Sequence, residues 1–198
     1  IAPFIESQSL LTHQGEVFGT KIFGVIPDLE ESVSVVSDFM IQGSMDSLKK
    51  DSFNIVLGLT QSRRLGAGLG DEIALMIPDL NSSFAGYFPK IKTFTVSGIF
   101  RVGSPELDQT NAFINIHDLS VLTSLDNKVT GLRLKFNDLF KANYLSLLAL
   151  SEAEKVSNQF LTTSDWTNSY GSLFEAIMQE RVLVCLLYTS DAADDGIR

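Results

Sequence analysis

The chain has 198 residues, a net charge of −9 and a sequence pI of about 4.6. A chain of this length can bury one large hydrophobic core or two small ones. The acidic balance disfavours a broad nucleic-acid or anionic-lipid surface, because such surfaces need clustered Lys and Arg side chains.

The first part of the chain is predicted to be mainly β. Alternating apolar and polar residues predict strands over 4–12 and 16–25, joined by a hairpin turn at 13–15. Residues 27–31 predict a turn or the start of a short helix, and the apolar pattern at 33–39 indicates no particular type of secondary structure. Three further elements are a buried strand at 54–58, a brief helix at 60–65 and a strand at 71–77.

Strands and helices interleave in the second part without a strict βαβ rhythm. Predicted strands lie at 93–100, 110–116, 129–136 and 159–163, and predicted helices at 119–125, 139–150 and 166–187. Asp118 is the expected N-cap of the helix at 119–125. The strand at 129–136 is expected to turn its apolar side chains inward and its charges outward. The predicted fold class is α+β.

The last predicted helix changes character along its length. It is amphipathic at 171–181 and then carries no charge from residue 182 to residue 188. A spanning helix needs roughly 20 apolar residues. We therefore interpret 182–188 as the start of a truncated transmembrane helix. Residues 189–198 have the composition of a solvated, non-native tail. Ile1 begins in mid-pattern, so the chain is expected to be trimmed at both ends.

Candidate catalytic and metal-binding residues are sparse. His13 and His117 lack metal-ligand spacing in the sequence and are expected to be ordinary surface histidines. Cys185 is the only cysteine, so the sequence contains no disulfide framework and no cysteine-based metal site. The glycine-rich stretch 66–70 lacks the Lys-Ser/Thr of a phosphate loop, which favours a turn.

Two carboxylates, Glu106 and Asp108, lie near Arg101 in the sequence. Paired carboxylates can perform acid–base chemistry, but such a cluster on a loop is more often a solvated turn or a structural ion pair. No catalytic, cofactor-binding or metal-binding residue is therefore predicted, and the chain is not expected to be an enzyme.

A long loop between two predicted strands carries three aromatic residues, Phe84, Tyr87 and Phe88. Connections beyond about 12 residues are uncommon in compact domains and are often functional. Exposed aromatic residues there would form a contact site. The alternative is that the rings fold back onto the sheet, and the residues by themselves favour this alternative.

Seven motifs in sequence order resemble the LolC/LolE permease family. They are NIVLG (54–58), LG (65–66) with GDEI (70–73), the loop after Pro78, FTVSGIF (94–100), AFINI (112–116), VTGLRL (129–134), and Trp166 with GSLFEAIMQER (171–181). The match covers nearly all of residues 1–187. The resemblance implies a subunit of the bacterial lipoprotein-releasing ABC transporter in the inner membrane. The chain would be the domain that faces the periplasm between its first two membrane helices.

The resemblance also implies a two-part, MacB-like periplasmic core. Residues 1–25 and 129–181 would form the membrane-proximal Porter part, built of βαβ units. Residues 26–128 would form the distal, mostly β Sabre part, inserted into Porter. The first Porter strand and helix would precede Ile1, so the fold is expected to be truncated at its N-terminus.

The long loop gains a specific interpretation from the resemblance. LolC-type members carry here a protruding hook that engages the periplasmic carrier LolA, and the corresponding hook loop is residues 79–92. The residues expected to contact the carrier are Phe84, Gly86, Tyr87, Phe88, Pro89 and Lys90. Aromatic side chains suit this role, because they bury a large area at modest entropic cost. A hook favours a LolC-type or single fused permease over a LolE-type one.

The resemblance implies transport without bond chemistry in this chain. The expected partners are a LolA-like carrier, a partner permease subunit, a lipoprotein substrate and a cytoplasmic ATPase reached through the membrane region. Residues 166–181 would act as a rigid lever, because a continuous helix transmits displacement. Two alternatives remain open: the ectodomain of a MacB-like efflux or signalling permease, and a soluble enzyme with a concave carboxylate site.

Overall fold

The computed structural model describes residues 1–78, 89–125, 128–138, 141–157, 160–166, 170–172, 175–176, 179–180 and 182–185. The chain divides into two compact units, Ile1–Lys135 and Phe136–Arg198. Among the described residues, the first unit carries the sheet and most of the helices, and the second carries a 15-residue helix and further helical residues beyond residue 165. Each unit is described by itself.

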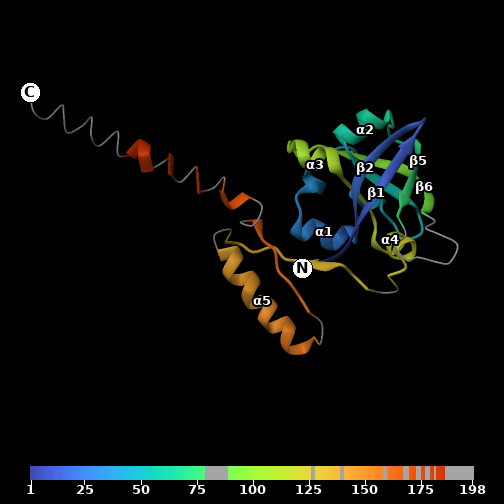
Figure 1. The fold of residues 1–198 in the computed structure, drawn as a ribbon. Helices are drawn as coiled ribbons and strands as arrows, with labels where there is room; N and C mark the ends of the chain where they lie inside the picture. The colour runs from blue at the N-terminus through green and yellow to red at the C-terminus, as the bar shows by residue number, and fades with distance from the viewer. Residues whose placement is uncertain are drawn as a thin grey trace, which may run out of the picture. The chain divides into compact units, whose positions relative to one another are not determined.

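Six strands of the first unit pair in a closed ring (Figure 1). They are β1 (Ala2–His13), β2 (Glu16–Val25), β4 (Asn54–Gly58), β5 (Glu72–Ile77), β6 (Lys90–Phe100) and β7 (Asn111–Asn115). The ring runs β1–β2–β7–β4–β6–β5 and returns to β1. The pairs β2–β7 and β4–β6 are parallel, and the other pairs are antiparallel. Closure protects strand edges that would otherwise be open.

Two short strands attach to the outside of this ring. β3 (Met40–Gly43) pairs with the end of β6, and β8 (Gly131–Arg133) pairs with the start of β1. Two 3₁₀ turns flank β3, at Val36–Phe39 and Met45–Ser47. β1 therefore has three neighbours along its length, namely β8 at its start, β2 from Ile5 to His13 and β5 near its end.

Four short helices connect the strands of the first unit: α1 (Pro27–Val33), α2 (Leu59–Leu65), α3 (Pro105–Thr110) and α4 (Ile116–Thr123). Glycine allows two of them to approach the strands closely. A Cβ atom on Gly24 would lie 3.0 Å from the Cβ of Leu119 in α4. A Cβ on Gly58 would lie 2.2 Å from the carbonyl oxygen of Asp108 in α3. Any side chain at Gly58 would therefore displace α3.

The strands bury two groups of apolar side chains. The larger group includes Ile5, Leu11, Ile22, Leu57, Leu75, Phe94, Ile114 and Leu119. The smaller group centres on Phe113, whose ring lies 5.7 Å from that of Phe23 and 5.5 Å from that of Phe100, measured between centroids. Aromatic pairs at this separation add to the stabilisation from buried area.

The second unit contains α5 (Ala142–Val156) and a described segment of irregular structure at 160–165. The amide Nδ2 of Asn143 in α5 donates to Oδ2 of Asp165 at 3.0 Å. Within the predicted helix at 166–187, the residues that the structure describes are helical. Residues 186–198 lie outside the described residues, so the predictions for the tail and the end of the apolar run stay predictions.

Most predicted elements of the first unit are confirmed, and the mixed α+β class with them. Three predictions are wrong. The N-cap of α4 is Asn115, whose Oδ1 accepts from the His117 amide at 2.9 Å, and not Asp118. The predicted strand at 129–136 is only three residues long, and its Leu132 is 62% exposed while Arg133 faces a buried carboxylate. The described residues 160–163 form no strand. The sequence analysis also missed β3 and α3.

The described part of the chain includes helices in both units. None of the helices there combines the length and the apolar character that a membrane span requires.

Candidate functional site

The predicted carrier-binding residues lie between β5 and β6. Phe84, Gly86, Tyr87 and Phe88 fall outside the described residues. Pro89 is described and exposed, and Lys90 is the first residue of β6. β6 thus begins three residues before its predicted start and takes in the end of the predicted hook loop, 79–92.

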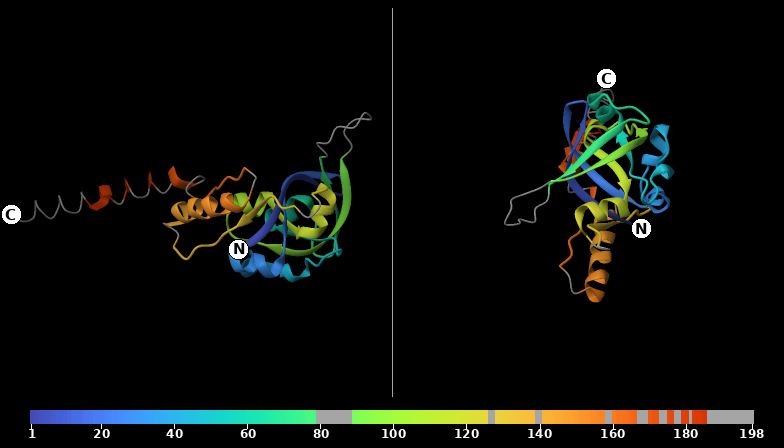
Figure 2. Two further views of the ribbon diagram at one scale, coloured as in Figure 1. Left: turned by 90° about the horizontal axis from the view of Figure 1, so that it is seen from below. Right: turned by 90° about the vertical axis from the view of Figure 1, so that its right-hand side faces the viewer.

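The two strands on either side of this segment remain paired as far as the residues next to it. We call this paired base the hairpin root (residues 77–78 and 89–92). Ile77, the last residue of β5, is the partner of Lys90. Figure 2 shows the two strands side by side, in green. Pro78 directly follows Ile77 and Pro89 directly precedes Lys90, and proline has no N–H with which to extend the ladder. The chain therefore leaves the closed ring of strands, which we call the barrel, and returns to it at the same point.

Two lysines of the hairpin root are held in position by neighbours. The Nζ of Lys90 donates to Oγ of Ser124 at 2.5 Å, just beyond α4. The Nζ of Lys92 lies 4.0 Å from the centroid of the Phe53 ring, a cation–π contact. Ile91, which alternates with them along β6, is 57% exposed. The root thus combines two fixed positive charges with an exposed apolar side chain.

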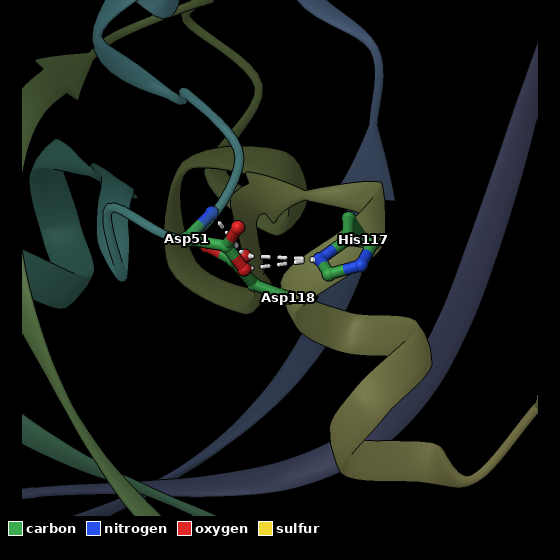
Figure 3. Close-up of side chains that lie close together, drawn as sticks. All are labelled: Asp51, His117 and Asp118. Carbon is green, nitrogen blue, oxygen red and sulfur yellow. Dashed lines mark hydrogen bonds and ion pairs between the residues drawn. The ribbon is translucent and has the colours of Figure 1, made fainter.

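A second cluster forms where α4 begins, from residues distant in the sequence (Figure 3). The Nδ1 of His117 lies 3.3 Å from Oδ1 of Asp51 and 3.8 Å from Oδ1 of Asp118. One possible metal-ligand atom from each residue lies within 4.8 Å of the others. The sequence predicts an ordinary surface histidine at this position, and the structure places two carboxylates beside the His117 ring. No local spacing could have indicated the cluster, because the third member comes from the turn before β4.

Asp118 in this cluster also has a structural role. Its side chain is completely buried, and its two oxygens accept from the backbone amides of Asp51 at 2.8 Å and Phe53 at 3.2 Å. Asp51 and Phe53 have positive φ values of 61° and 49°, a conformation that non-glycine residues rarely adopt. The Asp118 carboxylate therefore stabilises an uncommon turn as well as contributing negative charge to the cluster.

Another buried carboxylate, Glu30 of α1, is paired with Arg133 of β8. The guanidinium Nη1 of Arg133 donates to Oε1 of Glu30, which is 1% exposed. Burial raises the pKa of Glu30, and the nearby charge of Arg133 offsets part of that rise. The Arg133 guanidinium also lies 5.3 Å from the ring centroid of Phe4 and 5.5 Å from that of Phe23. This pair connects α1 to β8.

The carboxylates near Arg101 also have a structural explanation. Asp108 is 5% exposed, and its oxygens accept from the amides of Val102 at 2.8 Å and Gly103 at 3.1 Å. Glu106 is exposed. The stretch 66–70 forms a turn, as predicted, in which Gly66 ends α2 with φ +63°.

The known proteins that this chain resembles in sequence include LolC proteins from two bacteria. No protein-family model matches the sequence. Over 188 residues the chain is 35% identical to the lipoprotein-releasing system transmembrane protein LolC of Neisseria meningitidis serogroup B. The LolC protein of Xylella fastidiosa is 34% identical over 187 residues. These matches cover 95% and 94% of this chain. The predicted resemblance to the LolC/LolE permeases is confirmed.

The matched region is only part of those LolC proteins. The chain spans 45% of the Neisseria protein and 44% of the Xylella protein. Among solved structures, the extracellular domain of the ABC-type transporter YknZ from Gram-positive bacteria has a TM-score of 0.50 and is 8% identical. That match covers 77% of this chain and 75% of the YknZ domain. This likeness shows a shared fold between the chain and an ABC-transporter ectodomain.

Proposed function

We propose that the chain is the periplasmic domain of an ABC transporter permease subunit in the bacterial inner membrane. It would help to release lipoproteins from that membrane and hand them to a periplasmic carrier. The observation that carries this proposal is the similarity to LolC over 95% of the chain. The relative is named as a transmembrane component of a lipoprotein-releasing system, and the fold resembles an ABC-transporter ectodomain.

The hook loop is the proposed contact with a LolA-like carrier, through Phe84, Gly86, Tyr87, Phe88, Pro89 and Lys90. The hairpin root supports this role. It brackets the loop with two paired strands that end at Ile77 and Lys90, so the loop has a fixed origin. A fixed origin lowers the entropy lost on binding. The exposed side chain of Ile91 adds an apolar surface beside it.

The other proposed parts follow the same function. Residues 1–25 and 129–181 would lie near the membrane, and 26–128 would lie farther from it. Residues 166–181 would transmit motion from the membrane to this domain. A cytoplasmic ATPase would hydrolyse ATP, and a second permease subunit would complete the transporter. The domain itself would bind and move the lipoprotein without making or breaking covalent bonds.

Calorimetric titration of the protein with a LolA-like carrier tests this function. We expect micromolar binding that Tyr87→Ala/Phe88→Ala weakens at least tenfold, because aromatic residues at interface centres dominate binding free energy. The matched control is Tyr144→Ala/Phe160→Ala, which removes a tyrosine and a phenylalanine that are 67% and 93% exposed in the second unit. This control is expected to bind as tightly as the unchanged protein.

Two results would contradict the proposal in different ways. If the folded protein does not bind the carrier, the function moves to a permease ectodomain without a carrier, such as a MacB-like efflux or signalling protein. If binding occurs and both double variants bind equally well, the hook loop is not the contact and another surface must be.

A further inference from the structure

The Asp51–His117–Asp118 cluster has dimensions that suit a metal ion (Figure 3). The two carboxylate oxygens lie 3.3 and 3.8 Å from His117 Nδ1, and one ligand atom from each of the three residues lies within 4.8 Å of the others. A tetrahedral Zn²⁺ site with bonds of roughly 2.0–2.2 Å has ligand-to-ligand distances of about 3.3–3.6 Å. The two distances from His117 thus differ from such a site by no more than a few tenths of an ångström.

The nitrogen at the centre of the cluster has no hydrogen-bond partner. Nδ1 of His117 is inaccessible to solvent, although the ring as a whole is 40% exposed. Both nearby carboxylates lie within ion-pair distance, yet neither contact has hydrogen-bond geometry within the described structure. A buried polar atom without a partner is unfavourable. A cation between the three side chains would give this nitrogen a partner.

The carboxylates are arranged to accept a cation. Two backbone amides fix the orientation of the Asp118 carboxylate. A carboxylate offers about four lone-pair sites, so it can bind a metal as well. Hydrogen bonds of this kind orient metal ligands in known sites. Asp51 is 67% exposed, so water can reach the cluster and complete the coordination.

We propose that Asp51, His117 and Asp118 bind a divalent first-row transition-metal ion, represented by Zn²⁺. The imidazole ligand favours Zn²⁺ over Mg²⁺, which prefers oxygen ligands in octahedral geometry. Bound metal would join the turn before β4 to the start of α4. This proposal stands on the local geometry and is independent of the transport function.

Calorimetric titration of the full chain with ZnCl₂ and with MgCl₂ tests the site. All proteins carry Cys185→Ser, because an exposed cysteine can bind Zn²⁺ by itself. The test variants are Asp51→Asn and His117→Gln. Asparagine readily adopts the φ of 61° found at Asp51, so the turn is kept. Asp118 is left unchanged because it holds that turn. The matched controls are Asp46→Asn and His13→Gln.

We expect one Zn²⁺ to bind with micromolar affinity and Mg²⁺ to bind at least tenfold more weakly. Each test variant should weaken Zn²⁺ binding at least tenfold, whereas the controls should keep it. Circular dichroism melting without metal checks that every variant is folded. The proposal is overturned if millimolar Zn²⁺ does not bind, or if folded Asp51→Asn and His117→Gln bind Zn²⁺ as tightly as the controls.

Discussion

The two units of the chain bury their apolar side chains to very different extents. In the first unit Ile5, Leu57 and Phe94 are no more than 1% exposed. In α5 of the second unit Tyr144, Leu147 and Leu148 are 67%, 50% and 47% exposed. The closed barrel thus completes its own core, while α5 has large apolar side chains that are exposed within the described structure. The difference indicates that the free energy of folding comes mainly from the first unit, because buried apolar area dominates it.

The largest expected effect is the loss of a barrel side chain. Phe94→Ala should lower the free energy of unfolding by about 3–5 kcal/mol, since it leaves a cavity in a packed core. Urea denaturation measures this loss. A value near zero would contradict the view that the first unit contains the main stabilising core.

The Glu30–Arg133 pair is the next strongest test within the first unit. Arg133→Met should cost roughly 3 kcal/mol at neutral pH, because it leaves the buried Glu30 carboxylate without its cation. The double variant Glu30→Gln/Arg133→Met should recover much of that loss. Equal urea midpoints for the single and double variants would show that the pair is not coupled.

The turn held by Asp118 should be somewhat less sensitive. Asp118→Asn replaces one acceptor of the Asp51 and Phe53 amides with an NH₂ group, and we expect a loss of about 2 kcal/mol. The exposed Asp38→Asn is the matched control and should be neutral. If both variants melt like the unchanged protein, the turn does not depend on this carboxylate.

The pH dependence of stability should also distinguish Glu30. Burial raises its pKa above the ordinary value of 4.5, so the folded protein binds this proton more tightly than the unfolded chain. The resulting stabilisation is complete below pH 4.5 and is lost as the pH rises through the folded-state pKa. The free energy of unfolding of the unchanged protein minus that of Glu30→Gln should therefore fall as the pH rises above 4.5. A constant difference would contradict the raised pKa.

The smallest effect is expected on the exposed face of α5. Leu147→Ala should change the unfolding free energy by no more than about 0.5 kcal/mol, because its side chain is half exposed and alanine favours a helix. Urea denaturation again provides the measurement. A loss as large as that of Phe94→Ala would show that α5 is covered in solution and would remove the contrast between the units.

Local patterns predicted the barrel strands well, because alternation along a strand reports directly which face is buried. The strands at 16–25 and 54–58 match β2 and β4 at both ends. The errors arose where long-range contacts decide the structure. The alternation of residues predicts that the Arg133 side chain points outward. In the structure it instead donates to the buried carboxylate of Glu30, more than a hundred residues earlier. The same limit applies to β3, which is stabilised by its pairing with β6.

The candidate sites show the same division. The hook loop could be proposed from the sequence because its residues are contiguous and its motif resembles a family. The Asp51–His117–Asp118 cluster could not, because His117 and Asp51 are brought together only when α4 packs beside the turn before β4. The capping role of Asn115 was missed for a local reason. Asn and Asp are equally good caps, and the sequence places Asn115 and Asp118 three residues apart.

Hydrogen exchange of the full chain, with and without a LolA-like carrier, would show which residues the carrier contacts. We expect the carrier to slow amide exchange at residues 77–92, the hook loop and its root, and to leave exchange in α5 unchanged. Slower exchange across α5 with no change at 77–92 would contradict this expectation, and would place the carrier on α5 of the second unit.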